Sequence, residues 1–151
     1  LKARLETRRN NRDKNMNNFE RGKKLIDEAK DCYLDLLEAY KRKSWNLVIR
    51  RAQEVVELCL KGILKMMGIE YPKIHDVGEL FARVVRGKII DIEEEKIKKI
   101  KETSANLSRE RSRAFYMERD FTRSQAEKAK EDTEKILNWT KRLAIKISNK
   151  D

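Results

Sequence analysis

Apolar residues recur every three or four positions along most of the chain, which is the pattern of amphipathic helices. The pattern predicts a long first helix capped by Asn17 or Asn18, and a second helix capped by Ser44 and ended by Gly68. Pro72 prevents the second helix from resuming. The apolar positions are Ile26, Ala29, Tyr33, Leu36, Leu37 and Tyr40 in the first helix, and Trp45, Val48, Ala52, Val55, Cys59, Ile63 and Met66 in the second.

Two more helices have clear start signals. Asp76 and Glu79 have the spacing of a capping box and open a short helix that Gly87 closes. A last helix begins near Thr122 or Ser124. The apolar face of the short helix holds Leu80, Phe81 and Val84, and that of the last helix holds Ala126, Ala129, Thr133, Ile136, Thr140, Leu143 and Ile147.

A fourth long helix is predicted between these two. The spacing of Asp91 and Glu94 is that of a second capping box, and the polar stretch at 103–108 would allow a bend. Its apolar positions are Ile97, Ile100, Leu107 and Phe115. Period-two alternation and hairpin dipeptides are absent from the sequence, so we predict an all-α fold: an up-and-down four-helix bundle with an additional short helix.

Length and composition indicate one domain. The chain has 151 residues, enough to bury a core without metals or disulfides. Residues 1–15 are basic and are expected to be an N-terminal arm or upstream extension, with the helical domain at 16–151. We expect a cytoplasmic protein, because the sequence has no run of 18 apolar residues and no secretory signal. Cys32 and Cys59 fall on apolar stripes, which favours buried thiols.

Charge changes this picture most. The 37 Lys and Arg against 26 Asp and Glu give a net charge of +11, which attracts polyanions such as nucleic acid. The many charged residues and few glutamines are typical of heat-adapted proteins.

The sequence also has more large apolar side chains than one small core needs, which favours a homodimer. These residues are Trp45, Trp139, Met66 and Met67.

Most enzyme classes require residues that the sequence lacks. His75 is the single histidine, and the five glycines stand apart, so a His-rich metal site and a glycine-rich phosphate loop are both excluded. The acidic run 93–95 is expected to be a solvated face at a helix start. We therefore predict no catalytic residue, no metal site and no cofactor.

Two stretches resemble a known family. Residues 45–80 resemble the core signature of HEPN domains (higher eukaryotes and prokaryotes nucleotide-binding domains), and residues 108–129 match the position of the second signature, an arginine and aromatic segment. The signature positions of the first stretch are Ala52, Gln53, Glu57, Lys61, Pro72, His75 and Asp76. The likeness covers about residues 17–145.

The resemblance implies a helical bundle, commonly dimeric. It also implies a nucleotide-binding domain, a partner of a minimal nucleotidyltransferase, or a ribonuclease of toxin–antitoxin and defence systems. The ribonuclease branch has an arginine followed four to six residues later by a histidine. No histidine follows position 75 in this sequence, so that motif is absent.

The second signature supplies candidate binding residues. Arginines bind phosphate oxygens and aromatic rings stack on bases, so Arg109, Arg111, Arg113 and Tyr116 are predicted to contact a nucleotide or RNA. In the alternative, Phe115 and Phe121 fill the core while the arginines pair with Glu110, Glu118 and Asp120.

The loop before the short helix gives two more candidates. Lys73 and His75 are predicted to contact phosphate at the helix start, where backbone amides are free. The alternative is that Asp76 caps the helix and His75 only packs beside it.

Three functions follow. We expect a homodimeric binding module that holds a nucleotide or nucleic acid or associates with a nucleotidyltransferase, and that does not catalyse alone. A ribonuclease with a departed active site is the alternative, with Tyr116 or His75 in the missing role. A bundle that binds RNA or DNA through charge alone is a third possibility, and its binding would collapse with salt.

Overall fold

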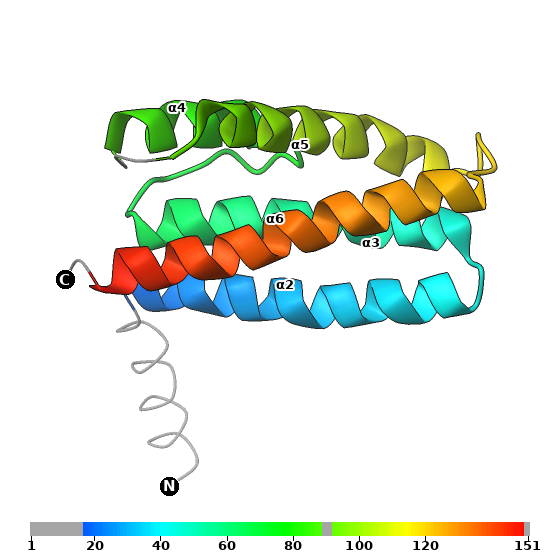
Figure 1. Cartoon of the computed structure of the whole chain (residues 1–151), viewed down its shortest axis with the longest axis horizontal. Coiled ribbons are helices and arrows are strands. Elements are labelled where there is room, and N and C mark those ends of the chain that lie inside the picture. The colour runs from blue at the N-terminus through cyan, green and yellow to red at the C-terminus, as the bar shows by residue number, and fades with distance from the viewer. Residues whose placement is uncertain (1–16, 89–91, 150–151) are drawn as a thin grey trace, which may run out of the picture.

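The computed structural model describes residues 17–88 and 92–149, and these ranges contain five helices and no strand. The helices are α2 (Asn18–Lys41), α3 (Trp45–Met66), α4 (Gly78–Lys88), α5 (Glu94–Phe115) and α6 (Arg123–Asn149). Figure 1 shows the chain running along α2, returning along α3, and repeating this path with α5 and α6. The predicted all-α bundle of four long helices and one short helix is confirmed. The predicted arm and Asp91 lie outside the described residues.

Helix α3 is the centre of the core because it is apolar on several sides. It packs against α2, α5 and α6, and more than half of its residues are buried. A fully buried Leu, Ile or Val side chain stabilises the fold by about 1.5–3 kcal/mol relative to an exposed one. Burial of α3 therefore fixes the other three long helices around it.

Helices α2 and α3 approach most closely at Gly22 and Gly62. A Cβ atom at Gly22 would lie 2.5 Å from the carbonyl oxygen of Gly62 and 2.6 Å from the backbone nitrogen of Met66. These distances are too short for any side chain, so the two backbones are in contact there. The absence of a side chain at Gly22 thus sets the spacing of the α2–α3 pair at this end.

The helix starts use side-chain caps at three places. Asn17 accepts a hydrogen bond of 2.9 Å from the backbone N–H of Glu20. Asp76 accepts a 3.0 Å bond from the backbone N–H of Gly78. Thr122 and Gln125 form a reciprocal capping box. Two predicted caps differ: Ser44 precedes α3 without a side-chain cap bond, and Asp76 caps at Gly78 rather than at Glu79.

Helix α5 is unbroken, although the sequence would allow a bend at 103–108. Thr103 and Ser104 are buried, and the Ser104 hydroxyl donates a 2.8 Å hydrogen bond to the carboxylate of Asp76. Because the Ser104 hydroxyl bonds to the loop before α4, it does not compete with the backbone of α5 for hydrogen bonds, while Thr103 lies on the side of α5 that faces α6.

The apolar surface predicted for a dimer is wrong in its residues. Met66 and Trp139 are buried, and Trp45 and Met67 pack against the core. The exposed large apolar side chains are instead Leu34, Ile74, Phe115, Tyr116, Met117 and Ile145. Within the described ranges, no helix combines the length and the apolar character that crossing a membrane requires.

Candidate functional site

A cleft of about 360 Å³ lies between α5 and the loop that precedes α4. Its lining residues are His75, Ser108, Arg111, Ser112, Phe115 and Tyr116. The residues from α5 recur every three or four positions, so they form one stripe along the helix. This stripe brings an arginine, two hydroxyls and two aromatic rings to the single histidine.

The Arg111 guanidinium is held at the base of the cleft by α3. Its Nη1 atom donates a 2.8 Å hydrogen bond to Oε1 of Gln53 and a 3.1 Å bond to Oε1 of Glu54. Glu54 also accepts a hydrogen bond from Arg51. One carboxylate is therefore shared by two guanidinium groups, and this part of the cleft keeps a net positive charge.

His75 is tied to the same network through Glu57. Its Nδ1 atom lies 2.8 Å from Oε1 of Glu57, and 58% of the side chain is exposed. Glu57 also accepts hydrogen bonds of 2.9 Å from Gln53 and 2.8 Å from Lys61. Burial alone would raise the pKa of Glu57, but these three hydrogen bonds outweigh it and hold the pKa below its ordinary value of 4.5.

The rim of the cleft is aromatic. The rings of Phe115 and Tyr116 form an edge-to-face pair with centroids 5.0 Å apart, and both side chains are more than half exposed. The guanidinium carbon of Arg50 lies 4.8 Å from the centre of the Phe115 ring. Below the rim, the Ser108 hydroxyl is buried and has no hydrogen-bond partner among the described residues. Exposed aromatic rings thus lie beside a buried hydroxyl that has no hydrogen-bond partner in the described part of the chain.

Asn46 fixes the turn that follows the aromatic pair. Its side-chain amide donates to the carbonyls of Ala114 and Arg119 at 3.3 and 2.9 Å, and its carbonyl accepts a 3.0 Å bond from the N–H of Phe121. These bonds tie the start of α3 to the α5–α6 connection. The position of Tyr116, which lies within that connection, depends on them.

Three of the six predicted binding residues meet in the cleft: Arg111, His75 and Tyr116. Lys73 is exposed on the loop and does not line the cleft. Arg109 and Arg113 are each two positions from Arg111, which places them about 200° away around the helix.

On that other side of α5, the arginines meet their own helix. Arg109 contacts the side chain of Asn106, and Arg113 lies 3.6 Å from a carboxylate oxygen of Glu110. Arg119 pairs with Glu110 as well. Of the acids named in the alternative, Glu110 has arginine partners, whereas the partner of Arg109 is an asparagine. Arg111 lines the cleft and pairs with Glu54 of α3.

The aromatic residues divide in the same way. Phe121 is buried in the core, whereas Phe115 is 54% exposed at the cleft rim. Asp76 accepts a hydrogen bond at the start of α4, from Gly78 rather than from the predicted Glu79, and His75 binds Glu57 rather than only packing beside the helix.

Sequence reasoning placed Gln53 and Glu57 in a family signature without giving them a role, and it missed Glu54 and Asn46. Gln53 carried a usable signal, because it follows Ala52 on the apolar side of α3 and a buried amide there needs hydrogen-bond partners. Asn46 carried no comparable signal, since an asparagine in the first turn of a helix is ordinary.

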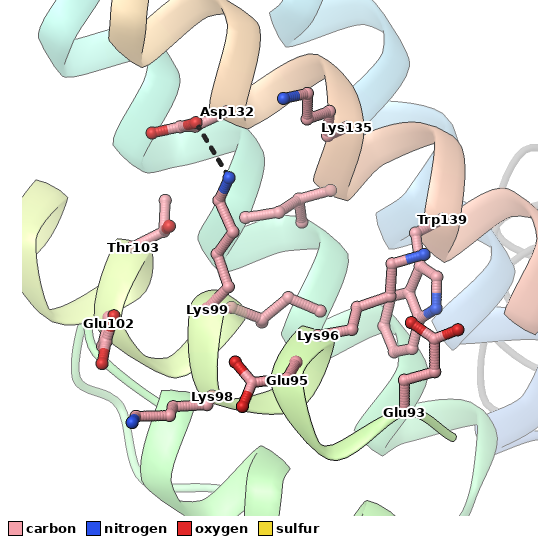
Figure 2. Close-up of a pocket in the computed structure, with 12 residues that line it drawn as sticks. Glu93, Glu95, Lys96, Lys98, Lys99, Glu102, Thr103, Asp132, Lys135 and Trp139 are labelled. Atoms are coloured by element: carbon pink, nitrogen blue, oxygen red, sulfur yellow. Dashed lines mark ion pairs between the residues drawn. The ribbon is translucent and has the colours of Figure 1, made fainter. Parts of the chain in front are cut away.

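A larger cavity of about 580 Å³ lies between α5 and α6, and Figure 2 shows its lining. Lysines and acidic residues are equally numerous there, and Lys99 of α5 reaches across to Asp132 of α6 at 3.8 Å. Trp139 presents little surface, because its side chain is buried. This balance of charge makes the groove a weaker anion site than the cleft.

The described residues contain no group of three or more His, Cys, Asp or Glu side chains placed to hold a metal ion. Cys32 and Cys59 are both free thiols and do not form a disulfide. Burial raises the pKa of both Cys32 and Cys59 to about 12.

The comparisons with known proteins agree with the sequence signatures. The profile described as "HEPN domain" matches residues 23–143, a range that runs from α2 into α6 and contains the whole cleft. No curated protein and no solved structure gives a significant match.

Proposed function

From the membership of this chain in the HEPN domain family, we propose that it is a binding module whose cleft holds a phosphate group of a nucleotide or nucleic acid, and that it does not catalyse alone. The observation that carries the proposal is the placement of Arg111. Its guanidinium is oriented by Gln53 and shares one carboxylate with Arg51, so it retains positive charge toward the cleft.

The other groups of the cleft suit the same ligand. The hydroxyl of Ser112 and the ring of His75 line the cleft and supply donors for phosphate oxygens. Tyr116 is exposed at the rim, where a base can stack on its ring. The net charge of +11 favours the approach of any polyanion.

The test compares two arginines of the same helix. We expect Arg111→Ala to weaken binding of AMP or of a single-stranded RNA oligonucleotide about 10- to 100-fold, because a charge-assisted hydrogen bond is lost. Arg113→Ala removes the same charge on the other side of α5 and should change the affinity less than about twofold. Fluorescence titration at two salt concentrations measures both.

Equal losses in the two variants would leave only attraction by net charge, which is the third function considered above. Absence of binding by the native chain would overturn the proposal. The contact of Arg113 with phosphate remains a prediction that the same titration tests, and Arg109→Ala measured in the same way tests the contact predicted for Arg109.

The family also suggests partners. We propose that the chain forms a homodimer in the cytoplasm and associates with a small nucleotidyltransferase, which would supply metal-dependent chemistry while this chain supplies phosphate contacts. Exposed Leu34, Met117 and Ile145 do not line the cleft and are apolar surface that a second copy would cover. Light scattering of the purified chain tests the dimer, and copurification with a co-expressed nucleotidyltransferase tests the association.

A second candidate, a metal-independent ribonuclease, is favoured by one observation. His75 Nδ1 lies 2.8 Å from Glu57, and a carboxylate at that position would orient the ring of a histidine acting as general acid or base; Arg111 lines the same cleft. Incubation of the chain with RNA at neutral pH in EDTA decides between the candidates. Cleavage that disappears in His75→Gln would support the ribonuclease, and intact RNA at high protein concentration would exclude it.

A further inference from the structure

The Gln53 side chain lies between Arg111 and Glu57 in the hydrogen-bond network of the cleft. It is on α3, only 2% exposed, and both ends of its amide are engaged. Its Nε2 atom donates a 2.9 Å hydrogen bond to Glu57 and a 3.5 Å bond to the backbone carbonyl of His75, and its Oε1 atom accepts a 2.8 Å bond from Arg111. Glu57 in turn lies 2.8 Å from Nδ1 of His75. A continuous path of three hydrogen bonds thus joins Arg111 to His75.

The chemistry of the partners fixes the orientation of this amide. Guanidinium groups only donate and an ionised carboxylate only accepts. A reversed amide would place its NH₂ against Arg111 and its oxygen against Glu57, and both contacts would be repulsive. Because Gln53 is buried, water cannot replace either partner without opening the α3–α5 contact.

We propose that Gln53 is a positioning residue that couples Arg111 to His75, so that the two side chains hold one anion as a preorganised pair. The proposal rests on the proposed function in taking phosphate as the ligand. Hydrogen bonds in a chain polarise one another, and removal of the central member leaves Arg111 with Glu54 and leaves Glu57 with a lysine and the histidine. Arg111 and His75 each keep a hydrogen-bond partner, but a change at Arg111 is no longer transmitted through hydrogen bonds to His75.

The chain offers two unusually simple spectroscopic probes. It has a single histidine, so His75 gives one set of ring resonances, and it has two glutamines, Gln53 and Gln125. Gln125 accepts a bond from the backbone of Thr122 through its oxygen, which leaves its NH₂ group as a matched reference. In the native chain we expect the side-chain NH₂ protons of Gln53 to exchange with solvent at least about tenfold more slowly than those of Gln125. Equal exchange would overturn the proposal without any variant.

The coupling itself is measured in two backgrounds, without ligand. We expect Arg111→Gln to shift the His75 ring resonances at least about twice as far in the native background as in the Gln53→Met background. Methionine has a similar length but forms none of the three hydrogen bonds of the Gln53 amide. A purely structural role of Gln53, or a direct electrostatic effect of Arg111 on the ring, predicts equal shifts in the two backgrounds, and that result would overturn the coupling. Circular dichroism establishes that each variant is folded.

Ligand binding then separates this inference from the proposed function. With inorganic phosphate as the probe, we expect Gln53→Met to lower the affinity about tenfold, although the residue need not touch the anion. Phosphate binding by the native chain together with unequal shifts supports both proposals. Binding together with equal shifts overturns only the coupling. Unequal shifts without binding of phosphate, AMP or RNA retain the coupling of Arg111 to His75, but they overturn the proposed function and with it the role of the pair in holding an anion.

Discussion

Asn46 is expected to contribute more to stability than its partly buried position suggests. Its side chain makes three hydrogen bonds to backbone groups of the α5–α6 connection. A buried intramolecular hydrogen bond contributes about 1 kcal/mol net, and water compensates part of that loss where the groups are accessible. We therefore expect Asn46→Ala to lower the free energy of unfolding by about 2 kcal/mol. For a chain of this length, the melting temperature should fall by about 4–8 °C.

Thermal and urea denaturation followed by circular dichroism measure this loss. Asn138→Ala, on the exposed side of α6, removes the same side chain and should change stability by less than about 0.5 kcal/mol. Asn46→Asp retains an acceptor for Phe121 but places a carboxylate against two carbonyl oxygens, so it should destabilise at least as much as alanine. A melting temperature close to that of the native chain for Asn46→Ala, or an aspartate variant of native stability, would refute the reasoning.

Four further outcomes are expected. Gly22→Ala should destabilise by about 2–3 kcal/mol in urea denaturation because its Cβ would meet backbone atoms, whereas Gly87→Ala, with open space around it, should change stability by less than about 1 kcal/mol. Met117→Gly should stabilise by roughly 1 kcal/mol in the same assay, since Met117 has a left-handed φ of 55°. Ionised Glu57 stabilises the fold fully above pH 4.5, and this stabilisation is lost as the pH falls through the lower pKa of the folded state. In acid titration below pH 4.5, the free energy of unfolding should therefore fall more steeply for the native chain than for Glu57→Gln. With a pKa of about 12, Cys59 should resist a thiol reagent at pH 8 until the chain unfolds.

The helices could be predicted because α2, α5 and α6 each have an apolar face of period 3.6 that packs against α3. Caps were harder. Ser44 occupies the predicted position without a side-chain bond, and Asp76 serves both Gly78 and Ser104. The freedom of α5 to bend could not be judged either, since Ser104 has its partner on a loop that is distant in sequence.

The candidate site was predicted in type but not in detail. Arginines at 109, 111 and 113 look equivalent in sequence, and only the stripe through Ser108 and Phe115 distinguishes Arg111 from its neighbours. A helical projection through the exposed aromatics would have made that distinction. The sequence signalled that a buried Gln53 needs hydrogen-bond partners, but the identity of those partners and the role of Glu54 depend on how α3 and α5 are placed together.

The backbone contact at Gly22 also bears on how this fold can diversify. A helix taken from another bundle and grafted in place of α2 would need glycine at this one position, whatever the rest of its surface. In an alignment of relatives, positions 22 and 62 should therefore vary together. A relative with a bulky residue at position 22 should have the first turns of α2 tilted away from α3, and this would widen the end of the bundle opposite the aromatic turn.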